Sequence, residues 1–141
     1  MTGGLFFGAW SEKVGRRKAI ITAALLAVPM VPLWAYGGSV VMYGIGVFLL
    51  QVMVQGAWGV VPAHLNELTP DTVRGFLPGF AYQCGVAVGG WISVVQDALK
   101  DHMSYANAMA LSATVVFILA AVVVSLGRER HAVEFGVVPA R

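Results

Sequence analysis

The charged residues of this chain that could form specific contacts gather in two short segments. The first segment contains Glu12, Arg16 and Arg17, with Gly8 and Gly15 among them, and the second contains Glu67 and Arg74. Carboxylates and guanidinium groups form the strong, geometrically specific ion pairs of proteins. We therefore expect Glu67 to pair with Arg16 or Arg17. We also expect Arg74 to approach Glu12.

A third group of polar residues lies in an otherwise apolar stretch. Gln51 and Gln55 are four residues apart, which places both amides on one face of a helix, and Trp58 lies two turns from Gln51 on that face. Amides can hydrogen-bond a carboxylate or a hydroxyl, and an indole can cover an apolar group. These three residues are candidates for lining a solute path. The alternative is that the glutamines join neighbouring helices, as buried amides often do in membranes.

The sequence shows no pattern of residues that is typical of an enzyme. It contains no cluster of metal-ligating residues, no nucleophile beside a base and no phosphate-binding loop. The sequence therefore predicts neither an enzyme nor a bound cofactor or metal. The net charge of +2 is too small to indicate nucleic acid as a partner.

The elements that must position these residues are long apolar segments. Hydrophobic residues make up 58% of the 141 positions and charged residues 11%, whereas soluble domains carry about 25% charged residues. Four stretches have the length that crosses a bilayer, at about residues 19–36, 40–63, 77–96 and 105–126. We predict an all-α membrane protein, a transmembrane helix bundle whose partner is the lipid bilayer. Residues 1–10 resemble the end of a helix with its start missing, residues 11–18 a basic loop, and residues 127–141 a polar tail.

The basic residues predict how these spans are oriented. If residues 11–18 are cytoplasmic, residues 64–75 and the tail are cytoplasmic too, because each pair of crossings returns to the same side. That side then holds Lys13, Arg16, Arg17, Lys18, Arg74, Arg128, Arg130 and Arg141. The other side holds only Lys100. The positive-inside rule therefore predicts a multi-pass protein of the cell membrane with a cytoplasmic C-terminus.

The first charged segment resembles a known signature. Its pattern is Gly-x3-Glu-Lys-x-Gly-Arg-Arg, which is similar to the cytoplasmic signature of the major facilitator superfamily. Glu12 stands where that family more often has aspartate, and Lys13 where it often has arginine. Without the family, Gly15 permits a tight reversal between helices, and Gly8 lets a neighbouring helix approach closely. A basic loop that merely obeys the positive-inside rule is the simpler alternative.

The second charged segment resembles a loop of the same superfamily. The sequence from Pro62 to Gly75 is similar to the Glu-Leu-x-Pro-x-x-x-Arg-Gly loop of its sugar and carboxylate members, most of all the proton-coupled lactate and sialate permeases. The order of the two motifs resembles one six-helix half of that fold. The resemblance implies that residues 1–10 end helix eight and that the spans are helices nine to twelve, in the C-terminal half. Helices two to six of the first half are the alternative.

The resemblance implies a transporter that works by alternating access, with a missing N-terminal half as its partner and a small organic solute, such as a carboxylate, as its cargo. It also implies that the two charged segments form a gate. No aspartate or glutamate lies inside a predicted span, so a proton-coupling acid would lie elsewhere. A small four-span membrane protein with a structural or partner-binding role is the alternative.

Overall fold

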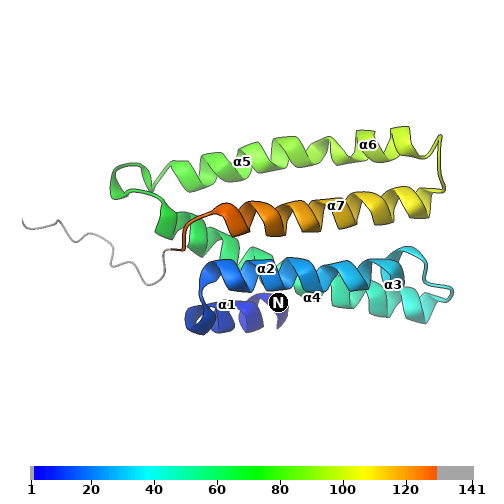
Figure 1. Ribbon diagram of the computed structural model, residues 1–141, viewed down its shortest axis with the longest axis horizontal. Helices are drawn as coiled ribbons and strands as arrows, with labels where there is room; N and C mark the ends of the chain where they lie inside the picture. Colours follow the sequence, from blue (N-terminus) through cyan, green and yellow to red (C-terminus); the bar gives the residue numbers. More distant parts are fainter. Residues whose placement is uncertain (1, 130–141) are drawn as a thin grey trace, which may run out of the picture.

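The computed structural model describes residues 2–129, and within that range it is built from helices without strands (Figure 1). The elements in chain order are α1 (Thr2–Val14), α2 (Arg16–Ala27), η1 (Val28–Met30), α3 (Val31–Ala35), α4 (Val40–Leu68), η2 (Asp71–Val73), α5 (Leu77–Gly90), α6 (Ile92–Leu99) and α7 (Tyr105–Leu126). The prediction of an all-α bundle is confirmed. Of the predicted tail, residues 130–141 lie outside the described residues.

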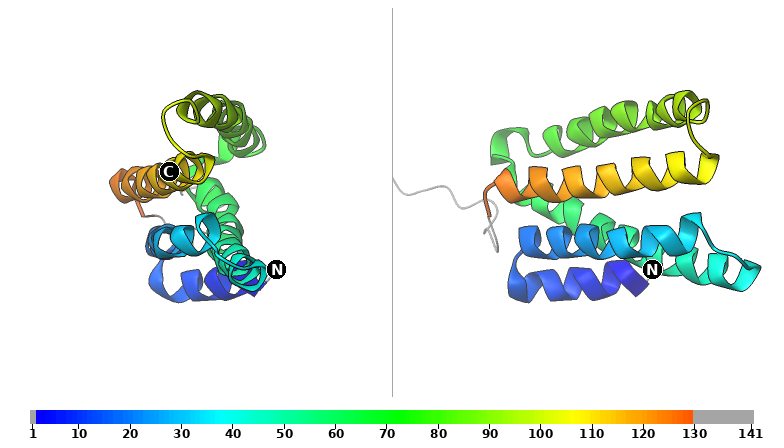
Figure 2. Two further views of the ribbon diagram at one scale, coloured as in Figure 1. Left: turned by 90° about the vertical axis from the view of Figure 1, so that its right-hand side faces the viewer. Right: turned by 45° about the vertical axis from the view of Figure 1, so that its right-hand side comes forward.

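The helices form an elongated bundle in which α4 and α7 are central. Helices α1 and α2 pack on α4, α2 also packs on α7, and α6 contacts α7. Figures 1 and 2 show α7 between α2 on one side and the α5–α6 pair on the other. The α1–α2 and α4–α5 connections and the end of α7 lie at one end of the bundle. The α6–α7 connection, which carries Lys100, lies at the opposite end, in agreement with the predicted segregation of charge.

The predicted basic loop is much shorter than residues 11–18. Helix α1 continues to Val14 and α2 begins at Arg16, so Gly15 alone separates them. Its φ of 98° lies in the positive-φ region that residues other than glycine rarely adopt. One glycine therefore reverses the chain, as its position in the motif predicted, and the flanking charged residues become helical.

Two of the predicted spans are interrupted. Residues 19–36 form α2, a 3₁₀ turn and α3, because Pro29 and Pro32 lack the N–H groups that an unbroken α-helix requires. Residues 77–96 form α5 and the start of α6, with the break at Trp91 directly after Gly89 and Gly90. Two adjacent glycines weaken a helix because their backbones are the most flexible when unfolded.

Three helical stretches are long and apolar enough to cross a membrane: Arg16–Ala35, Val40–Leu68 and Tyr105–Leu126. The last of these begins and ends at the residues predicted from the sequence, whereas the α4 helix runs on past Ala63 to Leu68. In an 18-residue window of each stretch, a third of the residues or fewer are buried within the described chain. Exposed apolar surface of this extent requires hydrocarbon around it, which makes this a multi-pass membrane protein.

Small residues allow the central helices to pack closely. The buried cluster consists of Phe7, Ala19, Ile20, Ala23 and Val60, from α1, α2 and α4. A Cβ at Gly3 would overlap the carbonyl of Val52, and one at Gly56 would overlap the Phe7 ring. These glycines are therefore where helices α1 and α4 meet.

The predicted close approach at Gly8 differs from the structure. No heavy atom of the described neighbours lies within 4 Å of a Cβ built at Gly8. The contact face of α1 consists instead of Gly3, Phe7 and Ser11, which are buried at four-residue spacing. Gly8 lies beside that face, so the spacing of the helix turns it away from α4.

Candidate functional site

Arg16 is the centre of a charged cluster at the end of the bundle where α1, α2, α4 and α7 meet. Its side chain is only 9% exposed. Its Nε donates to Glu67 Oε1 at 3.1 Å, and its Nη1 donates to the Ser11 hydroxyl at 2.6 Å. Its Nη2 lies 2.6 Å from a carboxylate oxygen of Glu12. The predicted pairing of Glu67 with an arginine of the first motif is confirmed.

The two acidic partners of Arg16 differ in their surroundings. The Glu67 side chain, in the last turn of α4, is 6% exposed, whereas that of Glu12 is 59% exposed. Burying a charged carboxylate costs free energy unless a cation pairs with it, so the burial of the Glu67 carboxylate depends strongly on its pairing with Arg16. An exposed pair contributes only about 0–1 kcal/mol. Of the two ion pairs of Arg16, the one with Glu67 joins α2 to α4, in addition to the apolar packing between these helices.

Arg17 and Glu129 join the start of α2 to the end of α7. The Arg17 Nε donates to the Val124 carbonyl at 3.0 Å, and Nη2 donates to the Ser125 carbonyl. In return, the Glu129 carboxylate accepts from the backbone N–H groups of Arg16, at 2.9 Å, and Arg17, at 3.1 Å. The Arg17 cation lies at the C-terminus of α7 and the Glu129 anion at the N-terminus of α2, and each charge is stabilised by the opposite end of a helix dipole.

Sequence reasoning missed Glu129 and Ser11 as members of this cluster. Glu129 was recognised only as part of the tail, and its contacts depend on how α7 lies against α2. A signal was present, because the first turn of α2 contains no acidic residue to complement its N-terminus. An acid from elsewhere in the chain was therefore to be expected there.

Arg74 stabilises the loop after α4. It donates to the carbonyls of Asn66, at 3.2 Å, and Thr69, at 3.0 Å, and it pairs with Asp71. These contacts fold the loop back onto the end of α4. The predicted approach of Arg74 to Glu12 stays a prediction.

His64 lies one turn before Glu67 in α4 and is buried. Its Nδ1 is a buried side-chain nitrogen without a hydrogen-bond partner within residues 2–129. Buried polar groups usually have partners. After Glu129 and Ser11, His64 is therefore a third residue of this end of the bundle whose position sequence reasoning did not predict.

The predicted solute-path residues all lie on the exposed side of α4. Gln51 and Gln55 line a small hollow of about 80 Å³ together with the start of α1. Neither amide has a hydrogen-bond partner in the described part of the chain, which argues against helix joining within these residues. Trp58 is 44% exposed, and its ring lies 5.3 Å from that of Tyr82. The three residues share a helix face, but the structure does not bring Trp58 into the hollow of the glutamines.

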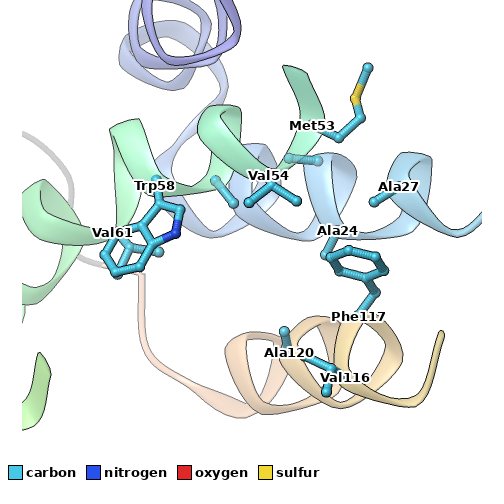
Figure 3. A pocket seen from close by; sticks show the side chains of 11 residues that line it. Ala24, Ala27, Met53, Val54, Trp58, Val61, Val116, Phe117 and Ala120 are labelled. Carbon is cyan, nitrogen blue, oxygen red and sulfur yellow. The ribbon is translucent and has the colours of Figure 1, made fainter. Parts of the chain in front are cut away.

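Trp58 instead borders an apolar hollow between α2, α4 and α7 (Figure 3). Its volume is about 220 Å³, and small or apolar side chains such as Ala24, Met53 and Phe117 line it. Among residues 2–129, no three acidic, histidine or cysteine side chains gather to hold a metal ion. The exposed polar groups of α4 include the two glutamine amides, the Trp58 indole and the Tyr43 hydroxyl.

Comparison with known proteins identifies relatives of this chain. Residues 1–128 match the model of the family described as sugar (and other) transporter. A carboxylic acid transporter homologue of Saccharomyces cerevisiae is 30% identical over 91% of this chain and 23% of its own length. A quinate permease of Neurospora terricola is 35% identical over 64% of the chain and 18% of its own length. A sialic acid transporter of Escherichia coli is 30% identical over 67% of the chain and 24% of its own length.

The chain therefore spans less than a quarter of the length of each of these relatives. No solved structure matched this chain significantly.

Proposed function

Because this chain belongs to the family of sugar and other transporters, within the major facilitator superfamily, we propose that it forms part of a secondary transporter for a small organic carboxylate. The observation that carries this proposal is the pair of amides of Gln51 and Gln55 in α4. Both are exposed in the middle of an apolar helix, and neither has a partner in residues 2–129. Since an amide in hydrocarbon is costly without a hydrogen bond, these groups require a polar partner, and we propose that the solute is that partner.

The carboxylate is proposed from two lines of support. Amide N–H groups donate to carboxylate oxygens, and Trp58, on the same face of α4 but outside the hollow of the glutamines, offers an apolar surface further along the path. Three relatives are named for a carboxylic acid, quinate and sialic acid. Another relative, 29% identical over 85% of this chain, is named as a proton myo-inositol cotransporter, so a polyol is the competing substrate class.

The charged cluster is proposed to act as a gate. Arg16 and Glu67 hold the ends of α2 and α4 together, and Arg17 and Glu129 hold α2 to α7. In this family's expected motion, two halves rock around a central site, and contacts at one end must break to open that side. The proposed role of these contacts is to bias a near-balanced equilibrium between the inward-open and outward-open states. The positive-inside rule favours a cytoplasmic location for this end and for the C-terminus, in the cell membrane.

The remaining partners are proposed from the length of the relatives. The solute site of this fold lies between two halves, so the proposed transporter includes an N-terminal half beyond these helices. If transport is coupled to protons, the titratable acid lies in that part. The small four-span membrane protein remains the alternative.

Uptake of labelled solutes tests this proposal. The longest reading frame that contains this chain is expressed in a host without monocarboxylate uptake, and initial rates are measured for a monocarboxylate, a hexose and inositol. We expect saturable uptake of the monocarboxylate. Uptake of the hexose or inositol alone would refute the carboxylate as substrate. A reading frame that begins at Met1 and confers no uptake would favour the small membrane protein.

Variants of the glutamines test the solute path. Replacing Gln51 or Gln55 with alanine is expected to raise the KM about tenfold or more, since a hydrogen bond to a charged group contributes about 1.5–3 kcal/mol. Gln96→Ala is the matched control, because Gln96 donates to the Ser112 hydroxyl at 2.8 Å and serves helix packing. It is expected to leave the KM unchanged. An unchanged KM in both test variants would remove these residues from the path.

A further inference from the structure

A hollow on the outer side of the α1–α2 hairpin combines cations with apolar surface. It has a volume of about 520 Å³ and is lined by Trp10, Lys13, Val14, Lys18, Ile21 and Thr22. The hairpin forms the edge of the bundle opposite the α5–α6 pair (Figure 1). We propose that this hollow binds an anionic phospholipid, with the head group at the two lysines and an acyl chain along the hairpin. This site does not depend on the transported solute.

Lys13 and Lys18 are cations without a partner in the part of the chain that the structure describes. Within residues 2–129, neither Lys13 nor Lys18 has a hydrogen bond or an ion pair, and both are exposed. By contrast, Arg16, Arg17 and Lys100 each have acceptors in the protein. The lysines come from the last turn of α1 and the first turn of α2, so the reversal at Gly15 brings both helix ends to one hollow. Two unpaired cations in one place favour an anion.

The depth of the lining residues matches the layers of a lipid leaflet. Lys13 and Lys18 lie two and three residues from the reversal at Gly15, which corresponds to about 3–5 Å along the helix axes. Trp10 and Ile21 lie about 8–9 Å from it. Tryptophan is enriched where hydrocarbon meets the head groups, and lysine extends its amine toward the polar layer. The hollow is therefore cationic outside and apolar toward the membrane centre.

An exposed apolar track continues from the hollow along both helices. Phe6 lies one turn before Trp10 and is 65% exposed, and Leu25 lies one turn beyond Ile21 and is 50% exposed. In an antiparallel hairpin these two side chains lie at similar depth, about 14–15 Å from Gly15. A soluble phosphate would use only the lysines. A phospholipid also covers this track, which is why we assign the site to a lipid.

The apolar floor of the site is rigid. The Trp10 ring packs edge-on against Phe7 at 5.9 Å, and Phe7 is 2% exposed in the core. Val14 also packs against the core cluster. Groups held in place before binding lose little conformational freedom on binding, which favours a retained lipid over a transient one.

Lipid retention by the purified chain tests the proposal. The 141-residue chain in detergent is exchanged with phosphatidylglycerol or phosphatidylcholine, and bound lipid is measured by native mass spectrometry. We expect phosphatidylglycerol to be retained preferentially. Each lysine near an anionic lipid surface contributes a factor of about five, so the Lys13→Gln/Lys18→Gln double variant is expected to bind about thirtyfold more weakly. Lys100→Gln, at the opposite end of the bundle, is the control and retains the wild-type preference.

A second readout locates the lipid. In a variant with Trp10 as the remaining tryptophan, phosphatidylglycerol with brominated acyl chains is expected to quench the indole fluorescence more than brominated phosphatidylcholine does. Lys13→Arg/Lys18→Arg keeps the charges and is expected to preserve retention and quenching. If the double glutamine variant loses its helical circular dichroism, the retention of phosphatidylglycerol is compared between the single variants Lys18→Gln and Lys100→Gln, and Lys18→Gln is expected to retain less. Equal retention of both lipids by the wild type, or unchanged retention in the glutamine variants, would overturn the proposal.

Discussion

Removal of the Glu67 carboxylate is expected to weaken the bundle more than removal of any exposed acid. Truncation of one partner of a buried ion pair typically costs about 3–5 kcal/mol, because the other charge is left uncompensated. Here Arg16 keeps Glu12 and the Ser11 hydroxyl, so the loss is smaller. We expect Glu67→Ala to lower the free energy of unfolding by about 2–3 kcal/mol. Glu67→Gln keeps an acceptor for the Arg16 Nε and is expected to lower it by about 1–2 kcal/mol.

Equilibrium unfolding in mixed micelles, followed by circular dichroism with an increasing fraction of denaturing detergent, measures these differences. Glu12→Gln is the matched control, because the Glu12 side chain is 59% exposed although it contacts the same guanidinium. We expect it to change the free energy of unfolding by less than about 1 kcal/mol. If Glu12→Gln destabilises the chain as much as Glu67→Ala does, burial does not decide the strength of these pairs and the reasoning fails.

Three further substitutions use the same unfolding measurement. Glu129→Gln removes the charge that accepts from two N–H groups of α2, and we expect a loss of about 0.5–2 kcal/mol, as for a lost helix cap; no loss would show that the contact is not maintained. Gly15→Ala forces a side chain to a φ of 98°, with an expected loss of about 1–2 kcal/mol, and a neutral result would contradict the one-residue reversal. Gly56→Ala is expected to lose about 1–3 kcal/mol because its Cβ overlaps Phe7, whereas Gly85→Ala, with open space around it, is the control and is expected to be neutral or stabilising.

Much of the fold is predictable because hydrophobic length and charge are local properties of the chain. The stretch that becomes α7 was recognised with its first and last residues, Tyr105 and Leu126, since apolar residues continue unbroken between polar connections. The segregation of basic residues correctly placed the α1–α2 and α4–α5 connections at one end of the bundle. The interruptions within the predicted spans were harder to predict from the sequence. The break at Trp91 follows two glycines, and only the hydrogen bonds of the folded backbone show whether such a pair bends a helix or ends it.

The candidate site was predictable in part for a related reason. The pairing of Glu67 with the arginines followed from opposite charges on segments expected at the same end. Which arginine makes the pair depends on the direction of each side chain from α2, and Arg16 faces α4 while Arg17 faces α7. The start of α2 indicated that an acid from elsewhere was needed, but the choice of Glu129 depends on how α7 packs against α2, more than one hundred positions along the chain.

The sequence alone determined that this chain is a membrane protein, that most of its cations lie at one end of the helices, and that it belongs with the transporters. Each of these follows from composition and short motifs, which need no knowledge of how helices meet. Only the tertiary structure decided which glycines meet a neighbouring helix, which acid is buried and which cations have no partner among residues 2–129. Those depend on the rotation of each helix about its axis, and packing sets that rotation where the apolar surface is nearly uniform all round.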